Sequence, residues 1–200
     1  MLSLPLRPRS AFAGLLPAKS AIQGLDILDR DGAGLGTIVV RRGARQAFRT
    51  ALQAQFGLDL REGPVLSIGE NLVLAGSGAD SWLAVSKGET RTLGATLAAS
   101  LTGCAAVCDQ SDGYGLLRLS GPNAAKVLQR LLPIDMHSNT FPQGSVASTI
   151  AAHIPLLVWR LDEATFELAV FRSYAASFMY ALGIAVRPFS RREATRPGRG

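Results

Sequence analysis

The feature that most constrains the fold is an internal repeat, in which two similar segments follow one another about 80 residues apart. In the first segment, Gly36–Val40 predicts a strand and Ala44–Gly57 predicts an amphipathic helix that ends at its glycine. In the second segment, Gly115–Leu119 predicts the strand and Gly121-Pro122 opens the helix. The spacing is longer than that of solenoid repeats, so it predicts two halves of one body.

Each segment then closes with a pair of strands and a helix. In the first, Trp82–Ser86 leads into a helix over Thr92–Ser100. In the second, Phe166–Val170 leads into a helix over Ser173–Leu182. We expect this last helix to be capped by its first residue and ended by Gly183.

The order strand, helix, strand, strand, helix, given twice, predicts an α+β fold. We expect two pseudo-symmetric halves of antiparallel sheet with packed helices, forming one domain over residues 21–186. The halves are expected at about 21–103 and 104–186, with hairpin turns at Gly76–Gly78 and at residues 161–164.

The net charge of +6 is carried by the two ends of the chain. Residues 1–20, expected as an irregular arm, hold basic side chains and no acidic one, and residues 187–200 form a basic tail with five arginines and one glutamate. The body between them is almost neutral, whereas a nucleic-acid reader carries its basic stripe on the folded part. We therefore expect no nucleic-acid partner, and a binder acting through the basic tail stays open as a minor hypothesis.

The composition excludes a disordered chain and points to a covered surface. Apolar residues make up 48% of the chain and charged residues 18%, against about 25% in a typical domain. Few charges are left for the surface, so we expect a partner to cover part of it. No uncharged stretch is apolar enough to predict a membrane span, and Cys104 and Cys108 do not suggest a secreted disulfide scaffold. The cytoplasm is the expected location.

The residues of catalytic chemistry do not form a recognisable set. Gly32–Gly36 precedes a strand, whereas a phosphate-binding glycine loop must follow one and open a helix. Ser111 and Cys108 lack a nucleophile elbow, and His137 and His153 are expected to be structural. We therefore expect no catalytic, cofactor-binding or metal-binding residue in this chain.

The second half resembles a known family. Asp109-Gln-Ser111, Gly121-Pro-Asn-Ala124, Gly144 and the strand Phe166–Val170 are similar to the opening half of the aminomethyltransferases, the glycine-cleavage T-proteins. With Phe171-Arg-Ser-Tyr-Ala175, the pattern most resembles the gamma subunits of heterotetrameric sarcosine oxidases. The resemblance covers roughly residues 20–186 and implies a T-protein-like fold.

The resemblance also implies a function. The folate-using relatives carry an acidic residue after the strand that follows the glycine, and Ala151-Ala-His-Ile-Pro155 here has no carboxylate. This departure implies a non-catalytic assembly subunit without a cofactor of its own. FAD, FMN, NAD, zinc and tetrahydrofolate would belong to partner chains: an alpha subunit on which this chain docks, and beta and delta subunits. The complex would oxidise sarcosine to glycine with formation of hydrogen peroxide, and would pass the one-carbon unit to tetrahydrofolate.

Four positions stand out by the resemblance, namely Asp109, Ser111, Gly121 and Arg172. We expect the first three to shape turns, where Asp and Gly are common. Arg172, at a strand-to-helix junction, is placed to bind a carboxylate or carbonyl of this chain or of a partner, or to be solvated. The alternative reading is a free-standing folate-binding protein on the same fold, which would bind tetrahydrofolate as an isolated chain.

Overall fold

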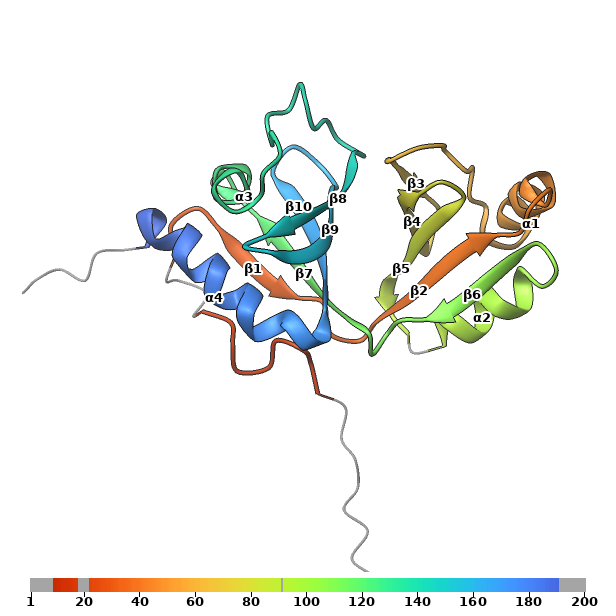
Figure 1. Cartoon of the computed structure of the whole chain (residues 1–200), viewed down its shortest axis with the longest axis horizontal. Coiled ribbons are helices and arrows are strands. Elements are labelled where there is room, and N and C mark those ends of the chain that lie inside the picture. Colours follow the sequence, from red (N-terminus) through yellow and green to blue (C-terminus); the bar gives the residue numbers. More distant parts are fainter. Residues whose placement is uncertain (1–8, 18–21, 91, 191–200) are drawn as a thin grey trace, which may run out of the picture.

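The computed structural model describes residues 9–17, 22–90 and 92–190. Two five-stranded antiparallel sheets face each other, and two α-helices cover the outer side of each sheet (Figure 1). The layers therefore run helix, sheet, sheet, helix. The α+β class, the two antiparallel sheets and the packed helices are confirmed.

The two repeats contain the same succession of elements. The first is β2 (Ala33–Val40), α1 (Arg45–Phe56), β3 (Leu66–Ile68), β4 (Leu72–Gly78), β5 (Ser81–Glu89) and α2 (Leu93–Ser100). The second is β7 (Tyr114–Ser120), α3 (Ala124–Leu131), β8 (Val146–Ala151), β9 (Ile154–Arg160), β10 (Thr165–Phe171) and α4 (Ala175–Val186). Two short strands precede the repeats, β1 (Asp26–Asp29) and β6 (Ala105–Asp109), and two 3-10 turns flank α4, η1 (Arg172–Tyr174) and η2 (Arg187–Phe189).

The two repeats exchange their preceding strands. The sheet of the first repeat has the order β3-β4-β5-β2-β6, and the sheet of the second has the order β8-β9-β10-β7-β1. β1 thus pairs with β7 of the second repeat, while β6 pairs with β2 of the first. The boundary expected near residue 103 separates the repeats in sequence, but the sheets interlock across it.

The sheets also meet at their opposite edges. Val65 and Ser145 form a β-bridge, the amide of Leu66 donates to the Gly144 carbonyl at 2.7 Å, and the amide of Val146 donates to the Pro64 carbonyl at 2.8 Å. The stretches before β3 and β8 occupy equivalent places in the two repeats. The contact between the two sheets at this edge is therefore made by the same segment of each repeat.

Three apolar clusters hold the layers together. α3 and α4 pack on the second sheet, α1 and α2 pack on the first, and a third cluster fills the space between the sheets. The central strands are consequently buried on both faces; five successive residues of β10, Phe166–Val170, are all buried.

Several predicted boundaries are corrected. The last helix starts at Ala175 after a 3-10 turn that contains Ser173, and Ser173 is therefore not its N-cap. Gly183 lies inside α4, which runs on to Val186, and is therefore not a terminating residue. α3 starts at Ala124, so Pro122 precedes the helix and does not lie in its first turn.

The predicted hairpin turns have different outcomes. The turn at residues 161–164 joins β9 to β10 and is confirmed. The turn expected at Gly76–Gly78 is wrong by two residues: these glycines end β4, and the chain reverses at Ala79-Asp80.

Both ends of the chain contribute to the second half. Phe12, in the segment expected as an irregular arm, is completely buried among the side chains of the second core. Beyond α4, Ser190 forms a β-bridge with Ile22, and the amide of Gln23 donates to the Phe189 carbonyl at 2.8 Å. Residues 1–8, 18–21, 91 and 191–200, which include most of the basic tail, lie outside the described residues.

In the described part of the chain, no helix has both the length and the hydropathy of a membrane span.

Candidate functional site

A cavity lies where the chain crosses between the sheets. It has a volume of about 490 Å³ and is lined by the β1–β2 turn, the β6–β7 turn, the N-terminal segment and the start of η1. Its walls carry both signs of charge, with Asp29, Asp31 and Asp112 on one hand and Arg30 and Arg172 on the other. Two of the four positions singled out in the sequence, Ser111 and Arg172, lie in this wall.

Asp109 and Ser111 form a turn against the first sheet. A carboxylate oxygen of Asp109 accepts the backbone N–H of Ser111 at 2.8 Å. The Ser111 hydroxyl in turn accepts the N–H of Leu35 at 3.1 Å and donates to its carbonyl at 3.3 Å. The bonds that the structure gives these two side chains go to the backbone at the crossing, where they tie the β6–β7 turn to β2.

Arg172 connects the start of η1 to the N-terminal segment. Its guanidinium donates to the Arg9 carbonyl, and its backbone N–H donates to the Gly113 carbonyl at 2.9 Å. Asp29, on the same cavity, accepts the Ser10 hydroxyl. Burial is the main cause that raises the pKa of Asp29 above its usual value, against the opposing hydrogen bond from Ser10. These contacts fasten the segment over the cavity.

Gly121 lies away from the cavity, just beyond the end of β7. Its φ is +115°, and a Cβ there would lie 2.6 Å from the Gly24 carbonyl oxygen. A side chain would therefore collide with the chain that enters β1. The structure thus brings Asp109, Ser111 and Arg172 into one region around the crossing and leaves Gly121 outside it.

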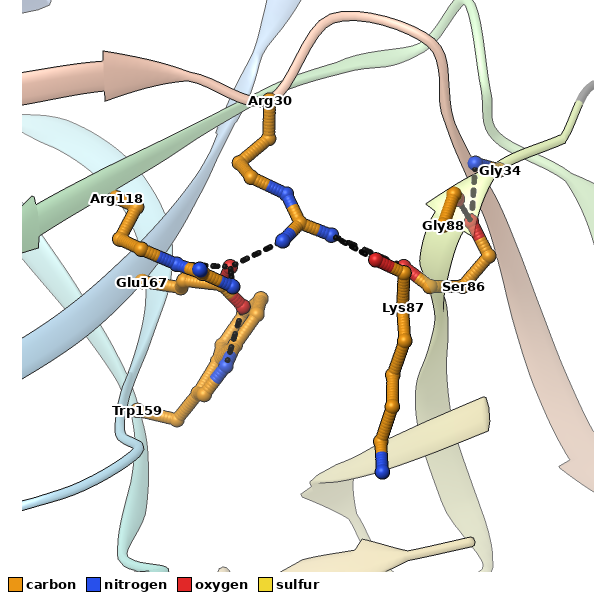
Figure 2. A network of polar contacts seen from close by, with 8 residues as sticks. All are labelled: Arg30, Gly34, Ser86, Lys87, Gly88, Arg118, Trp159 and Glu167. Atoms are coloured by element: carbon orange, nitrogen blue, oxygen red, sulfur yellow. Dashed lines mark hydrogen bonds and ion pairs between the residues drawn. The ribbon is translucent and has the colours of Figure 1, made fainter. Parts of the chain in front are cut away.

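A buried carboxylate joins the two sheets, and sequence reasoning missed it. Glu167 on β10 is 4% exposed and accepts two bonds from Arg118 of β7, at 2.8 and 3.0 Å, and one from the Trp159 indole N–H at 3.1 Å (Figure 2). The three residues lie opposite one another in the ladders of the second sheet. Glu167 is therefore bonded to two side chains of its own sheet.

Arg30 extends this network to the first sheet. Its guanidinium lies 3.5 Å from Glu167, and it also donates to the carbonyls of Ser86 and Lys87 on β5, at 3.2 and 3.0 Å (Figure 2). The Ser86 hydroxyl accepts the N–H of Gly34 at 2.8 Å. Arg30 is therefore a side chain that touches both sheets at once, beside the crossing.

A sequence signal for this region exists in the repeat itself. Asp29-Arg-Asp-Gly-Ala-Gly-Leu35 and Asp109-Gln-Ser-Asp-Gly-Tyr-Gly-Leu116 share an Asp, an Asp-Gly pair and a Gly-Leu pair. Each segment joins one of the exchanged strands to the first strand of a repeat. Aligning them would have identified both crossing turns and the equivalent places of Arg30 and Gln110.

The remaining reactive side chains are scattered. His153 is exposed at the β8–β9 turn, where Ala152 and His153 both have positive φ, and it does not lie within an apolar strand. His137 is exposed as well, Cys104 is buried and Cys108 is exposed. Among the described residues, no group of three or more His, Cys, Asp or Glu is placed to hold a metal ion. The stretch Ala151–Pro155 spans this turn, since Ala151 ends β8 and Ile154 and Pro155 begin β9.

The sequence of this chain is similar to one protein family. A model described as the sarcosine oxidase gamma subunit family matches residues 41–186. The chain is 33% identical over 149 residues to the sarcosine oxidase subunit gamma of an Arthrobacter species, covering 73% of this chain and 72% of the relative. It is 31% identical over 135 residues to the subunit gamma of Corynebacterium sp. strain P-1, covering 67% of this chain and 66% of that relative.

Solved structures share the fold. A chain of heterotetrameric sarcosine oxidase from Corynebacterium sp. U-96 superposes with a TM-score of 0.80 at 25% identity, covering 94% of this chain and 98% of that one. The glycine cleavage aminomethyltransferase T of Bartonella henselae superposes with a TM-score of 0.58 at 17% identity, covering 82% of this chain and 46% of that one. The second likeness shows that the fold of this chain corresponds to part of a T-protein.

Proposed function

Because this chain belongs to the sarcosine oxidase gamma subunit family, we propose that it is a non-catalytic assembly subunit of a heterotetrameric sarcosine oxidase. The observation that carries the proposal is the superposition on a chain of such a complex, which covers 94% of this chain and 98% of that one. The correspondence is with a whole subunit, so it favours a role within an assembly. It does not favour the free-standing folate-binding protein.

The geometry of the crossing is consistent with a structural role. The Ser111 hydroxyl is bonded to the backbone of Leu35, and the Asp109 carboxylate caps its own turn. Glu167, the buried carboxylate, is held by Arg118, Trp159 and Arg30. These polar groups are bonded to one another and to the backbone around the crossing, as a structural role requires.

The reaction would then belong to the complex. Sarcosine would lose two electrons and two protons, one proton from its N-methyl carbon and one from its nitrogen, to give an imine. Water would add to the imine, and glycine and a one-carbon unit at the formaldehyde level would be released. The two electrons and two protons would convert O₂ to hydrogen peroxide, and the one-carbon unit would pass to tetrahydrofolate with loss of water. We propose that the flavins, NAD, zinc and folate are held by the alpha, beta and delta chains, and that this chain docks on the alpha subunit.

The proposal is tested by co-expressing the tagged chain with the other sarcosine oxidase subunits of its host. Affinity purification followed by size-exclusion chromatography should give one peak that contains all subunits and absorbs as a flavoprotein. The same chain expressed alone should be colourless. A colourless chain that elutes alone beside well-folded partner subunits would overturn the proposal, and saturable heat on titration with tetrahydrofolate would then support the free-standing reading.

A further inference from the structure

Several of the large apolar side chains that the described surface exposes come from one stretch of the chain, at and around α4. Of nine such residues, four lie between the end of β10 and the end of α4, namely Phe171, Tyr174, Tyr180 and Ile184. Tyr180 is 72% exposed, the highest value among the nine, and Ile184 follows it one helical turn later at 44%. The exposed residues of α4 are Ala176, Ser177, Tyr180, Gly183 and Ile184, so its outer face carries no charge.

The repeat provides an internal comparison for this face. α2 occupies the place of α4 in the first repeat. It is anchored by Leu97 and, at its C-cap, by Leu101, as α4 is by Phe178 and Leu182. Two residues after the first anchor, α2 has an alanine where α4 has Tyr180. The exposed residues of α2 are Ala95, Thr96, Ala98 and Ala99. The same scaffold position therefore does not require a large apolar side chain, and the exposed Tyr180 needs another explanation.

Basic side chains border the end of this face. α3 packs beside α4 in the same outer layer (Figure 1), and a groove of about 460 Å³ lies between α3 and η2. The groove is lined by Lys126 and Arg130 together with the apolar side chains of Met136 and Phe189. Exposed Arg187 follows directly on α4. The carboxylate in the groove wall, Asp135, is hydrogen-bonded to the His137 N–H and the Thr140 hydroxyl.

The chain continues with the same sign of charge. Residues 191–200, which lie outside the described part, contain four arginines and one glutamate and follow directly on Ser190. An uncharged face with a tyrosine and an isoleucine, near a groove lined by basic side chains, is complementary to a protein surface with an apolar strip and adjacent carboxylates. Tyrosine is enriched at the centres of protein interfaces, because it buries a large area at a small cost in conformational entropy.

We infer that the outer face of α4, centred on Tyr180 and Ile184, is the surface by which this chain docks on the alpha subunit of the sarcosine oxidase complex. The partner presents an apolar strip that covers this face, with acidic side chains opposite Lys126, Arg130 and Arg187. The inference rests on the proposed function and adds the face by which the chain is held. The first half, with its exposed polar α1 and small-residue α2, stays outside this contact.

The test uses the full chain co-expressed with the other subunits. In one double variant, Tyr180→Ser and Ile184→Ser remove the apolar strip. In the matched control, Val39→Ser and Ile68→Ser remove two apolar side chains of the first sheet that are 51% and 53% exposed. A third variant, Lys126→Glu with Arg130→Glu, reverses the charge of the groove. Thermal unfolding of each isolated chain checks that the fold is retained.

We expect the Tyr180/Ile184 variant to bind the partner subunits at least tenfold more weakly than the parent chain, and the Val39/Ile68 variant to bind within twofold. The charge reversal should slow association, most clearly at low ionic strength. If the folded Tyr180/Ile184 variant binds as well as the parent, or if the control loses binding instead, the inference is overturned while the proposed function stands. If the parent chain itself fails to assemble with the other subunits, both the proposed function and the inference on the α4 face are wrong.

Discussion

Gly63 and Gly144 occupy equivalent positions in the two repeats and adopt nearly the same left-handed backbone, with φ of +86° and +85°. The residues that follow them pair with each other, through the Val65–Ser145 bridge and the two hydrogen bonds beside it. The same local conformation is thus used twice to join the sheets at one edge. The similarity of the two repeats therefore extends to the φ angle of a single glycine in each.

Replacing either glycine by alanine tests this conformational requirement. A Cβ at Gly63 would have no neighbour within 4 Å, and one at Gly144 would have only an Arg61 nitrogen at 3.7 Å, so a clash is not the cause of any effect. We expect Gly63→Ala and Gly144→Ala each to lower the free energy of unfolding by about 1–2 kcal/mol, because an L residue is disfavoured at positive φ. Urea denaturation measures the change.

Gly88 provides the control for the glycine variants. It lies in β5, its φ is outside the positive region, and a Cβ there would also have no neighbour within 4 Å. Gly88→Ala should leave stability unchanged or raise it slightly, since alanine loses less backbone entropy than glycine on folding. Equal losses in all three variants would show that the backbone angle is not responsible.

The buried network around Glu167 gives a second prediction. Glu167→Leu leaves the guanidiniums of Arg30 and Arg118 without their carboxylate, and removing one member of a buried ion pair costs about 3–5 kcal/mol. The corresponding position of the first repeat is Leu83, which also faces the other sheet, so the size of leucine is compatible with the site. Exposed Glu163 is the control: Glu163→Leu should change the free energy of unfolding by less than about 0.5 kcal/mol. A similar loss in both variants would contradict the role of the network.

Phe12 gives a third prediction, on the N-terminal segment. Its ring is completely buried, and a Cβ added to Gly115 would lie 2.5 Å from it. Phe12→Ala should lower the free energy of unfolding by about 3–5 kcal/mol through the cavity left in the second core. Leu15→Ala, at a position that is 39% exposed in the same segment, should cost less than about 1 kcal/mol. If denaturation curves show the two variants to be equal, the segment is not part of the core.

Asp135 gives a prediction on pH. The backbone N–H of His137 and then the Thr140 hydroxyl lower the pKa of Asp135 below its usual value of 3.8. A carboxyl whose pKa is lowered on folding stabilises the folded state above pH 3.8, and this stabilisation is lost as the pH falls through the lower value. The difference in free energy of unfolding between the parent chain and Asp135→Asn should therefore be largest near neutral pH and shrink in acid.

Urea denaturation at a series of pH values between about 7 and 3 checks this linkage. Thr140→Val removes one of the two hydrogen-bond donors, and it should show a smaller difference with the same direction of pH dependence. A difference that grows on acidification would contradict the prediction.

The sequence predicted the fold class because the repeat and the apolar periodicity are local signals. The exchange of β1 and β6 between the sheets was not predicted, since a four-residue strand such as Asp26–Asp29 does not show by its own pattern which distant strand it will join. The end of α4 was misplaced for a different reason. A glycine such as Gly183 predicts the end of a helix, but this one lies on the exposed face of α4, whose buried residues continue to Val186.

The polar network was hidden for a physical reason too. β10 is buried on both faces, so its sequence is a nearly continuous apolar run in which alternation carries no information about Glu167. Its partner Arg30 lies far away in sequence, within a turn that is rich in glycine and aspartate. The sequence singled out Ser111 as a serine without a nucleophile elbow and Arg172 by its place at a strand-to-helix junction, but it did not show that the two lie on one cavity. Their structural role stays a prediction.

The exchange of strands has a consequence for the order in which a ribosome completes this fold. β1 is among the first strands to be synthesised, but its partner β7 follows only after all of the first repeat has been made. The first sheet is likewise completed only when β6 emerges, beyond α2. In a nascent chain that stops at the end of the first repeat, β1 therefore has no partner strand, because β7 has not been made. The first sheet also lacks its edge strand β6. The two halves mature together, late in synthesis, as one unit.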